Sequence, residues 1–315
     1  MKKLMEIVQK IAESDLESYR SGFIVPEEFL TSVLEIKNGY LNYCHIEELY
    51  DILVENYYEF ELELLRTASR FIVSLDISHS TLMELRNLIA RRLANVTTSS
   101  RMYIDQMEKH VKKIFGDESS EYLRVKKFIS QQYDSLLGYR TLEKLRNYAQ
   151  HRGFPISFAG ASFGTDKHAT TSKLSFTCIP YISINDMRQD SKFPRYIIDE
   201  LVENCPEDNV DLRPLVREYL YGISCIHSEV RNILSSPIKS WESAITFLID
   251  NVGKNFDPHN FVTFWESKGK NNQLSIHLSK KVILRKDELV KKNSVPQRFH
   301  YYFISNQIDE EELKN

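Results

Sequence analysis

The spacing of hydrophobic residues predicts that the first half of the chain is helical. Across residues 46–71, apolar side chains recur at intervals of three and four, which places them on one face of a helix about seven turns long. Thr81 and Glu84 have the spacing of a capping box, so a second helix is expected to begin at Thr81. The polar residues 95–100 predict a break before a third helix over residues 101–115.

A fourth helical stretch is predicted over residues 119–151. Gly138 marks the place where it is expected to bend or divide, because glycine costs about 1 kcal/mol in a helix interior. Long amphipathic helices with short connections predict an up-and-down bundle. The stretch 44–63 is acidic and contains no Lys or Arg, and we interpret its acids as a solvated helix face in preference to an acidic patch.

The pattern changes after residue 151. Alternating apolar positions predict one hairpin from strands near 156–158 and 174–178 and another from strands at 261–265 and 273–278. These four strands are expected to pair into one small antiparallel sheet. Three further helices are predicted, at residues 195–204, 212–234 and 241–251.

The predicted fold is therefore mainly α, in two parts. An N-terminal helical bundle over residues 1–155 is followed by an α+β region over residues 156–315, with a small antiparallel sheet. A length of 315 residues agrees with two domains. The sequence contains no internal repeat and no low-complexity linker, so the two parts are expected to pack against each other.

Composition narrows the classes of function. The chain has 41 Lys and Arg against 44 Asp and Glu, a net charge of −3, which excludes a uniformly basic surface but leaves room for a local basic site. The sequence contains no Rossmann or P-loop glycine motif. Its four cysteines have no zinc-site spacing, so neither a metal nor a cofactor is expected. The absence of a long apolar run predicts a cytoplasmic protein without a membrane span or signal peptide.

The segment that suggests chemistry is RNYAQH, from Arg146 to His151. Gly153 and Pro155 follow it and predict that the helix ends there. The helix dipole alone would explain cations such as His151 and Arg152 in a last turn. It does not explain Arg146 and the Asn beside it.

The order of Arg146, Asn147 and His151 resembles the Arg-polar-x-x-x-His signature of the HEPN superfamily. Members share a core helical bundle that carries the motif late in its sequence. Many are metal-independent ribonucleases that act as toxins, phage-defence effectors or CRISPR-associated nucleases, whereas others have lost activity and serve as binding or structural domains. The resemblance extends over the motif and the helical region before it, and residues beyond about 156 match no family.

The chemistry of RNA cleavage explains why these residue types would be needed. His151 would transfer a proton, because an imidazole titrates near neutral pH. Arg146 would bind the phosphate and stabilise the negative charge that it gains in the transition state. Asn147 would orient either the substrate or His151 through a hydrogen bond.

Helix geometry limits what one copy of this motif can do. Five residues rotate by about 500° along an ideal helix, so Arg146 and His151 lie about 140° apart around the axis. Both can reach one phosphate only if the helix loosens near His151 or if two copies face each other. The resemblance to HEPN nucleases implies the second arrangement, in which two motifs form one composite active site across a dimer. We therefore expect a homodimer.

Local charge agrees with RNA as the partner. Residues 109–152 contain ten Lys and Arg against five Asp and Glu, a net charge of +5 that would attract a phosphate backbone. Arg152, Lys144 and Tyr148 are the expected RNA contacts. The tyrosines of this segment have two interpretations, base stacking or packing, of which packing is preferred. They are Tyr133, Tyr139 and Tyr148.

Two functions are expected as alternatives. The first is a metal-independent endoribonuclease of HEPN type in a toxin or phage-defence effector, with RNA as substrate and an antitoxin or regulatory protein as a candidate second partner. The second is a non-catalytic HEPN-like protein that dimerises or binds a partner.

Overall fold

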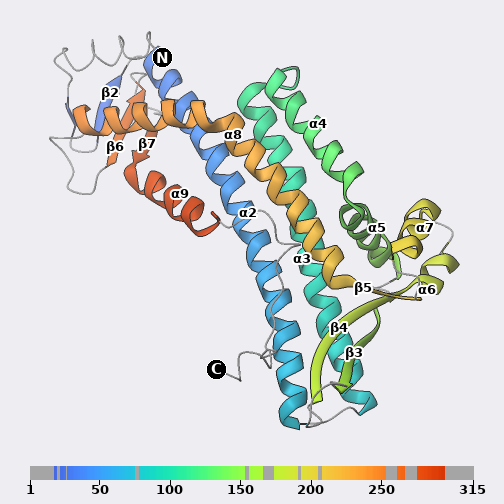
Figure 1. Ribbon diagram of the computed structural model, residues 1–315. Helices are drawn as coiled ribbons and strands as arrows, with labels where there is room; N and C mark the ends of the chain where they lie inside the picture. The colour runs from blue at the N-terminus through green and yellow to red at the C-terminus, as the bar shows by residue number, and fades with distance from the viewer. Residues whose placement is uncertain are drawn as a thin grey trace, which may run out of the picture. The chain divides into compact units, whose positions relative to one another are not determined.

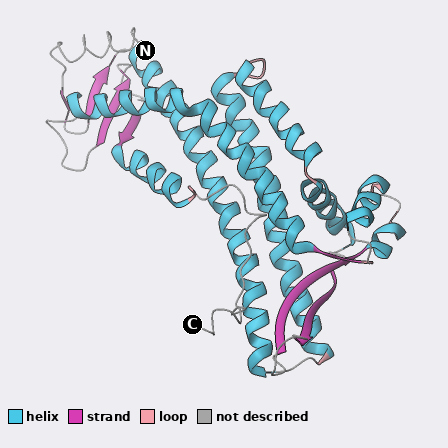
Figure 2. Ribbon diagram, in the orientation of Figure 1, coloured by secondary structure: helices cyan, strands magenta, loops and turns pink. Residues whose placement is uncertain are grey.

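The computed structural model is mainly helical, with small sheets (Figure 1, Figure 2). It describes residues 18–19, 22–25, 27–74, 78–152, 156–165, 174–190, 193–204, 208–252, 261–266 and 275–294. The helices are α2 (Glu27–Ser74), α3 (His79–Phe115), α4 (Ser120–Ser135), α5 (Leu137–Arg152), α6 (Ile184–Gln189), α7 (Arg195–Asn204), α8 (Leu212–Val252) and α9 (Lys280–Lys292). The mainly α class expected from the sequence is thus confirmed.

The second and third predicted helices are one continuous helix, α3, so the predicted break at residues 95–100 is wrong. Thr97 Oγ1 donates to the Leu93 carbonyl at 3.0 Å, and Ser99 Oγ donates to the Asn95 carbonyl at 2.7 Å. Small polar side chains that bond back to the preceding turn can be buried inside a helix without an unpaired hydroxyl. The predicted cap is also displaced, because Ser78, rather than Thr81, precedes the first turn.

The fourth predicted helix is divided as expected, into α4 and α5. The reason lies in packing as well as in propensity. The Gly138 N–H donates to the Glu218 carboxylate, and a Cβ atom at this position would lie 2.5 Å from the Leu215 carbonyl oxygen. Glycine therefore allows the start of α5 to approach the backbone of α8 closely.

The helices predicted at 212–234 and 241–251 are also one continuous helix, α8, which contains Pro237. A proline removes one backbone donor from a helix interior and is usually disruptive there. On both sides of it, α8 contributes fully buried side chains, such as Leu234 and Leu248, to the core. Burial of an amphipathic face outweighs local propensity in a helix of this length.

The two predicted hairpins are present but belong to separate sheets. One sheet has the order β1 (Ser18–Tyr19), β2 (Gly22–Val25), β6 (Phe261–Glu266) and β7 (Ser275–Ser279), and the other has the order β3 (Ile156–Thr165), β4 (Leu174–Ser183) and β5 (Asn209–Asp211). The expectation of one sheet is therefore wrong. β2 pairs in parallel with β6 and extends the second hairpin, and β5 pairs antiparallel with β4 and extends the first.

The chain forms two compact units that do not coincide with the predicted parts 1–155 and 156–315. Unit 1 contains Met1–Val54, Met102–Phe128 and His227–Ser294, and unit 2 contains Glu55–Arg101, Ile129–Ile226 and Val295–Asn315. Helices α2, α3, α4 and α8 contribute residues to both units. Each unit therefore combines segments from both halves of the sequence.

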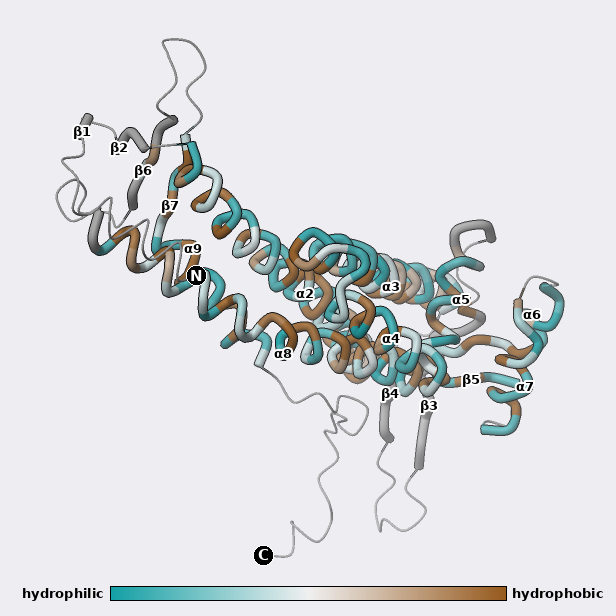
Figure 3. The backbone as a smooth tube through the Cα atoms, turned by 90° about the horizontal axis from the view of Figure 1, so that it is seen from above, coloured by the Kyte–Doolittle hydropathy of each residue, from teal (hydrophilic) through white to brown (hydrophobic). Residues whose placement is uncertain are grey.

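Each unit has its own apolar core. In unit 1, Phe29 packs edge-to-face on Phe264 with ring centroids 5.4 Å apart, and Tyr40 and Ile46 are fully buried. Figure 3 shows hydrophobic and hydrophilic residues alternating along α2 and α8, as the helical period requires. The core of unit 2 includes the fully buried residues Phe60, Leu93, Leu142, Ile197 and Tyr219. Among the described helices, none combines the length and the apolar character that crossing a membrane requires.

The close approach at Gly138 leads to a prediction about stability. Gly138→Ala is expected to lower the free energy of unfolding by about 1–3 kcal/mol, because the added methyl group would overlap the α8 backbone. Urea unfolding followed by circular dichroism measures the change. Ser135→Ala, at an exposed position one turn earlier, is the matched control and should change the stability by less than about 0.5 kcal/mol. Equal stability of the two variants would contradict the packing argument.

Candidate functional site

The sequence motif lies in the second half of α5, in unit 2. The helix runs from Leu137 to Arg152 without interruption, so the backbones of Arg146 and His151 are both helical. The sequence left two ways for Arg146 and His151 to reach one phosphate, a loosened helix or two facing copies. The helix does not loosen between these two residues. The two positions therefore face directions about 140° apart around the axis. The side chains of His151 and Arg152 lie outside the described residues.

Arg146 is half-buried and lacks a carboxylate partner among the described residues. Its Nε is fully buried and has no hydrogen-bond partner there, and its Nη1 donates to the Asn147 side-chain oxygen at 3.4 Å. Asn147 itself is exposed. The structure thus brings two of the three predicted catalytic residues into contact, through an amide that leaves most of the guanidinium's donors available.

Other arginines of unit 2 behave differently. Arg140 donates two hydrogen bonds of 2.6 Å to the Glu200 carboxylate, and Arg217 donates two, of 2.7 and 2.9 Å, to Glu61. Buried polar groups are normally satisfied in this way, and a bidentate carboxylate is the strongest partner for a guanidinium. Arg146 departs from this pattern, and a phosphate has the same bidentate geometry as the missing carboxylate.

The predicted RNA contacts lie on different parts of α5. Lys144 is partly exposed, and no ion pair involves it among the described residues. Tyr148 is half-buried. Tyr139 is buried, and its ring packs edge-to-face on Tyr219 with centroids 5.0 Å apart, so packing is its role. The Tyr133 ring also packs edge-to-face on the Tyr139 ring, with centroids 5.9 Å apart.

Sequence reasoning missed one residue beside the motif helix. Helices α5 and α7 are in contact, and Figure 1 shows them side by side. Tyr196, the second residue of α7, is 53% exposed. An isolated tyrosine in an amphipathic helix carries no signal in the sequence, and only the packing of α7 on α5 reveals its position.

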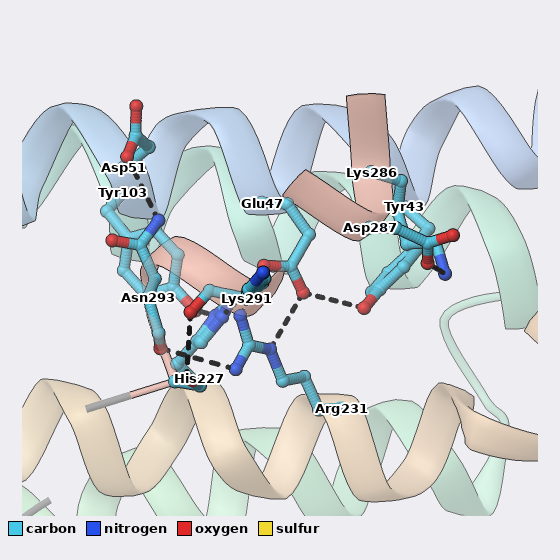
Figure 4. A network of polar contacts seen from close by, with 11 residues as sticks. Tyr43, Glu47, Asp51, Tyr103, His227, Arg231, Lys286, Asp287, Lys291 and Asn293 are labelled. Atoms are coloured by element: carbon cyan, nitrogen blue, oxygen red, sulfur yellow. Dashed lines mark hydrogen bonds and ion pairs between the residues drawn. The ribbon is translucent and has the colours of Figure 1, made fainter. Parts of the chain in front are cut away.

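A second polar cluster lies in unit 1 and centres on Glu47 (Figure 4). Glu47 is fully buried, so the interpretation of the acidic stretch 44–63 as a solvated face is wrong at this position. Its carboxylate accepts hydrogen bonds of 2.8 and 2.6 Å from Arg231 and one of 2.6 Å from the Tyr43 hydroxyl. Burial alone would raise the pKa of Glu47, but the hydrogen bonds from Arg231 and the nearby ring of His227 outweigh it and lower the pKa well below its usual range.

His227 connects this carboxylate to a tyrosine. Its Nε2 lies 3.3 Å from Glu47, and its Nδ1 lies 2.8 Å from the Tyr103 hydroxyl. Burial lowers the pKa of His227, so the ring is neutral at physiological pH. Although Nε2 is nearest to Glu47, it has no partner in hydrogen-bond geometry among the described residues. Tyr50 stacks on the imidazole with centroids 3.7 Å apart.

The order Glu47–His227–Tyr103 is that of a proton relay, but no substrate can reach it. All three side chains are at most 2% exposed, and a catalytic group must touch its substrate. The cluster also anchors α9, because Arg231 donates to the Asn293 carbonyl and Asn293 donates to Asp51 at 3.0 Å. We interpret it as a structural network that joins α2, α3, α8 and α9 within unit 1.

Other candidate chemistry is not assembled in the described residues. No group of three or more His, Cys, Asp or Glu side chains there has an arrangement that could hold a metal ion. Cys44, Cys178 and Cys225 are free thiols, and burial raises the pKa of each of them. Cys205 lies outside the described residues.

The buried carboxylate predicts an acid-sensitive stability. Glu47→Gln should lower the free energy of unfolding by about 3–5 kcal/mol at pH 7, because it removes the charge that compensates Arg231. Since folding lowers the pKa of Glu47, its contribution is complete above the unfolded pKa of about 4.3 and is lost as the pH falls below it. Urea unfolding at pH 7 and near pH 4 should therefore show a smaller pH dependence for this variant than for the wild type. Glu48→Gln, at an exposed position beside it, should retain the wild-type dependence.

Comparison with known proteins assigns no family to the chain. It matches no protein-family model, no curated protein and no solved structure. A functional argument must therefore come from the residues themselves, and it starts from Arg146, whose guanidinium has no carboxylate partner among the described residues.

Proposed function

We propose that the protein is a metal-independent endoribonuclease of HEPN type. The observation that supports it is Arg146, a half-buried arginine without a carboxylate partner among the described residues, on the same helix as His151. Placing a buried donor without an acceptor costs free energy, so such a group calls for a reason. A phosphodiester that binds there during the reaction supplies the acceptor oxygens.

The proposed reaction uses the substrate's own nucleophile. The 2′-oxygen attacks the neighbouring phosphorus as its proton moves to the imidazole of His151. The resulting imidazolium then gives a proton to the 5′-oxygen as the bond from phosphorus to that oxygen breaks. The products are a 2′,3′-cyclic phosphate and a 5′-hydroxyl. Arg146 stabilises the additional negative charge on the phosphate oxygens in the transition state. Asn147, which already contacts Arg146, orients the guanidinium.

The uninterrupted helix favours a composite site in a homodimer. Because α5 continues as a helix to Arg152, Arg146 and His151 of one chain face different directions. Two chains related by a two-fold axis present the same segment to each other, so the arginine of one can meet the histidine of the other. A toxin or phage-defence effector in the cytoplasm, restrained by an antitoxin or a regulatory protein, is the biological role that we propose with this activity.

A first experiment tests the catalytic residues. Purified wild-type protein is incubated with RNA and a chelator beside Arg146→Ala and His151→Ala. We expect cleavage to fall by about 10²–10³-fold without the arginine and by about 10²–10⁴-fold without the histidine. His79→Ala and Arg91→Ala, at exposed positions of α3, are matched controls and should cleave like the wild type.

Two results would contradict the catalytic assignment. Equal cleavage by all variants would exclude a role for the motif. A wild-type protein that forms a dimer but cleaves no RNA, together with a dimer weakened by Arg146→Ala, would favour the non-catalytic binding function instead. The half-buried position of Arg146 is the observation that makes this second function a real alternative.

A second experiment tests whether the site is shared between two chains. In a mixed dimer of Arg146→Ala and His151→Ala chains, one chain retains the histidine and its partner retains the arginine. If the site is composite, the coexpressed pair should cleave RNA at least about tenfold faster than either variant alone. If both groups act within one chain, no mixed dimer contains a complete set, and the mixture should stay as inactive as its components.

A further inference from the structure

Two histidines from different helices lie against each other in unit 1. His45 is an exposed residue of α2, and His110 is a partly buried residue of α3. Their ring centroids are 5.5 Å apart, and the ring planes are tilted by 31°. Neither ring belongs to the Glu47 network or to the motif on α5, so the functions considered above leave this pair unexplained.

The hydrogen bond of His110 determines which ring nitrogen carries its proton. Asn42, one turn before His45 on α2, donates its Nδ2 to the Asn38 carbonyl at 2.7 Å, which directs its Oδ1 toward His110. This oxygen lies 2.7 Å from His110 Nδ1. Because an amide oxygen only accepts hydrogen bonds, Nδ1 is the donor, and the lone pair of the neutral ring lies on Nε2.

His45 has the same arrangement with a different acceptor. Its Nδ1 lies 3.1 Å from Oε2 of Glu48, one turn further along α2. A carboxylate accepts the Nδ1 hydrogen, so the lone pair of the neutral His45 ring also lies on Nε2. Neither Nε2 has a hydrogen-bond partner among the described residues. Histidines that bind metals usually donate their other ring N–H to an oxygen acceptor in this way.

The separation of the rings fits one shared ion. Zinc binds imidazole nitrogen at about 2.0–2.1 Å, and a tetrahedral angle between two such bonds places the ring centroids about 5 Å apart. The observed 5.5 Å is close to this value. The side chain of His45 is exposed, so a small rotation about its side-chain torsions can complete the approach.

The local charges are compatible with a cation. Burial lowers the pKa of His110 to about 4, and the nearby charges of His45 and two lysines act in the same direction. The His110 ring is therefore neutral at pH 7, and no proton has to leave it before a metal binds. The two lysines, Lys109 and Lys113, also repel a cation, and the Glu48 carboxylate beside His45 opposes part of that repulsion.

We propose that His45 and His110 form a binding site for a divalent transition-metal ion such as Zn²⁺, which would link α2 to α3 within unit 1. The two Nε2 atoms are the protein ligands, and water fills the remaining positions. Imidazole suits zinc, copper and nickel, whereas Mg²⁺ and Ca²⁺ require oxygen ligands. This site lies outside the α5 motif and takes no part in the proposed RNA cleavage.

The site is expected to bind its ion reversibly. Structural zinc sites use four protein ligands, and a site with half as many is expected to have a Kd on the order of 1–100 µM. Binding to the folded chain alone shifts the unfolding equilibrium toward the folded state. An ion that joins two helices should therefore raise the Tm of the protein.

Titration calorimetry of the full-length protein without an affinity tag tests the proposal, with ZnCl₂ at pH 7 as the probe. His45→Gln and His110→Gln should each weaken Zn²⁺ binding by at least about tenfold, because each removes one of two ligands. His45 is exposed, so its variant is expected to retain the fold. His79→Gln, at an exposed position of α3 in unit 2, is the matched control and should bind like the wild type. MgCl₂ should give no binding heat.

Asn42→Ala tests the orientation of His110 while both ligands remain. Loss of such an outer hydrogen bond should weaken Zn²⁺ binding by about 10–100-fold. Thermal unfolding in metal-free buffer shows whether each variant is folded. In the same measurement, Zn²⁺ should raise the Tm of the wild type but not that of His45→Gln.

Each outcome decides the proposal. Zn²⁺ binding that is weakened by both histidine variants but not by His79→Gln supports the site. Equal affinity of His45→Gln and the wild type overturns it, even if His110→Gln binds less well, because His45 is then no ligand. A wild-type protein that does not bind Zn²⁺ overturns it as well. None of these results depends on whether the protein cleaves RNA.

Discussion

Buried carboxylates on α2 constrain how the helices of each unit pack. An ionised carboxylate without water needs hydrogen-bond donors, and leaving it unpaired costs several kcal/mol. In unit 1, Glu47 meets this need with Arg231 and with Tyr43, which ties α2 to α8 and fixes their register. In unit 2, the partly buried Glu61 accepts two hydrogen bonds from Arg217, further along the same two helices. Apolar packing favours association of these helices, whereas the ion pairs allow one alignment.

The same rule makes the exception on α5 informative. Two arginines of unit 2 that approach the core, Arg217 and Arg140, are each paired with a carboxylate. Arg146 has instead a weak contact to a neighbouring amide and a buried Nε without an acceptor among the described residues. This arginine stands at the position where the sequence resembles a nuclease motif. The proposed ribonuclease site and the buried ion pairs thus follow from one principle, that a buried charge requires a partner.

The residues proposed to bind and cleave RNA lie on two different faces of α5. Arg146 lies on one side, and Lys144 shares the other with the position of His151, because these two are separated by almost two full helical turns. A rigid helix can present an RNA strand to one face and a phosphate-binding group to the other only by using a second copy of itself. Helix geometry therefore supports the proposed composite dimer independently of the sequence resemblance.

The sequence by itself determined the features that depend on neighbours along the chain. The helical period, both hairpins, the division near Gly138 and the placement of the motif at the end of a helix were all readable, because side chains three or four residues apart report a shared face. The tertiary structure decided the continuity of α3 and α8, the separation of the two sheets and the position of Tyr196. It also decided that Glu47 is buried, since its partner Arg231 lies 184 residues away. A sequence pattern predicts that a glutamate on a polar helix face is solvated. Its burial can be recognised only when the folded chain places a distant arginine against it.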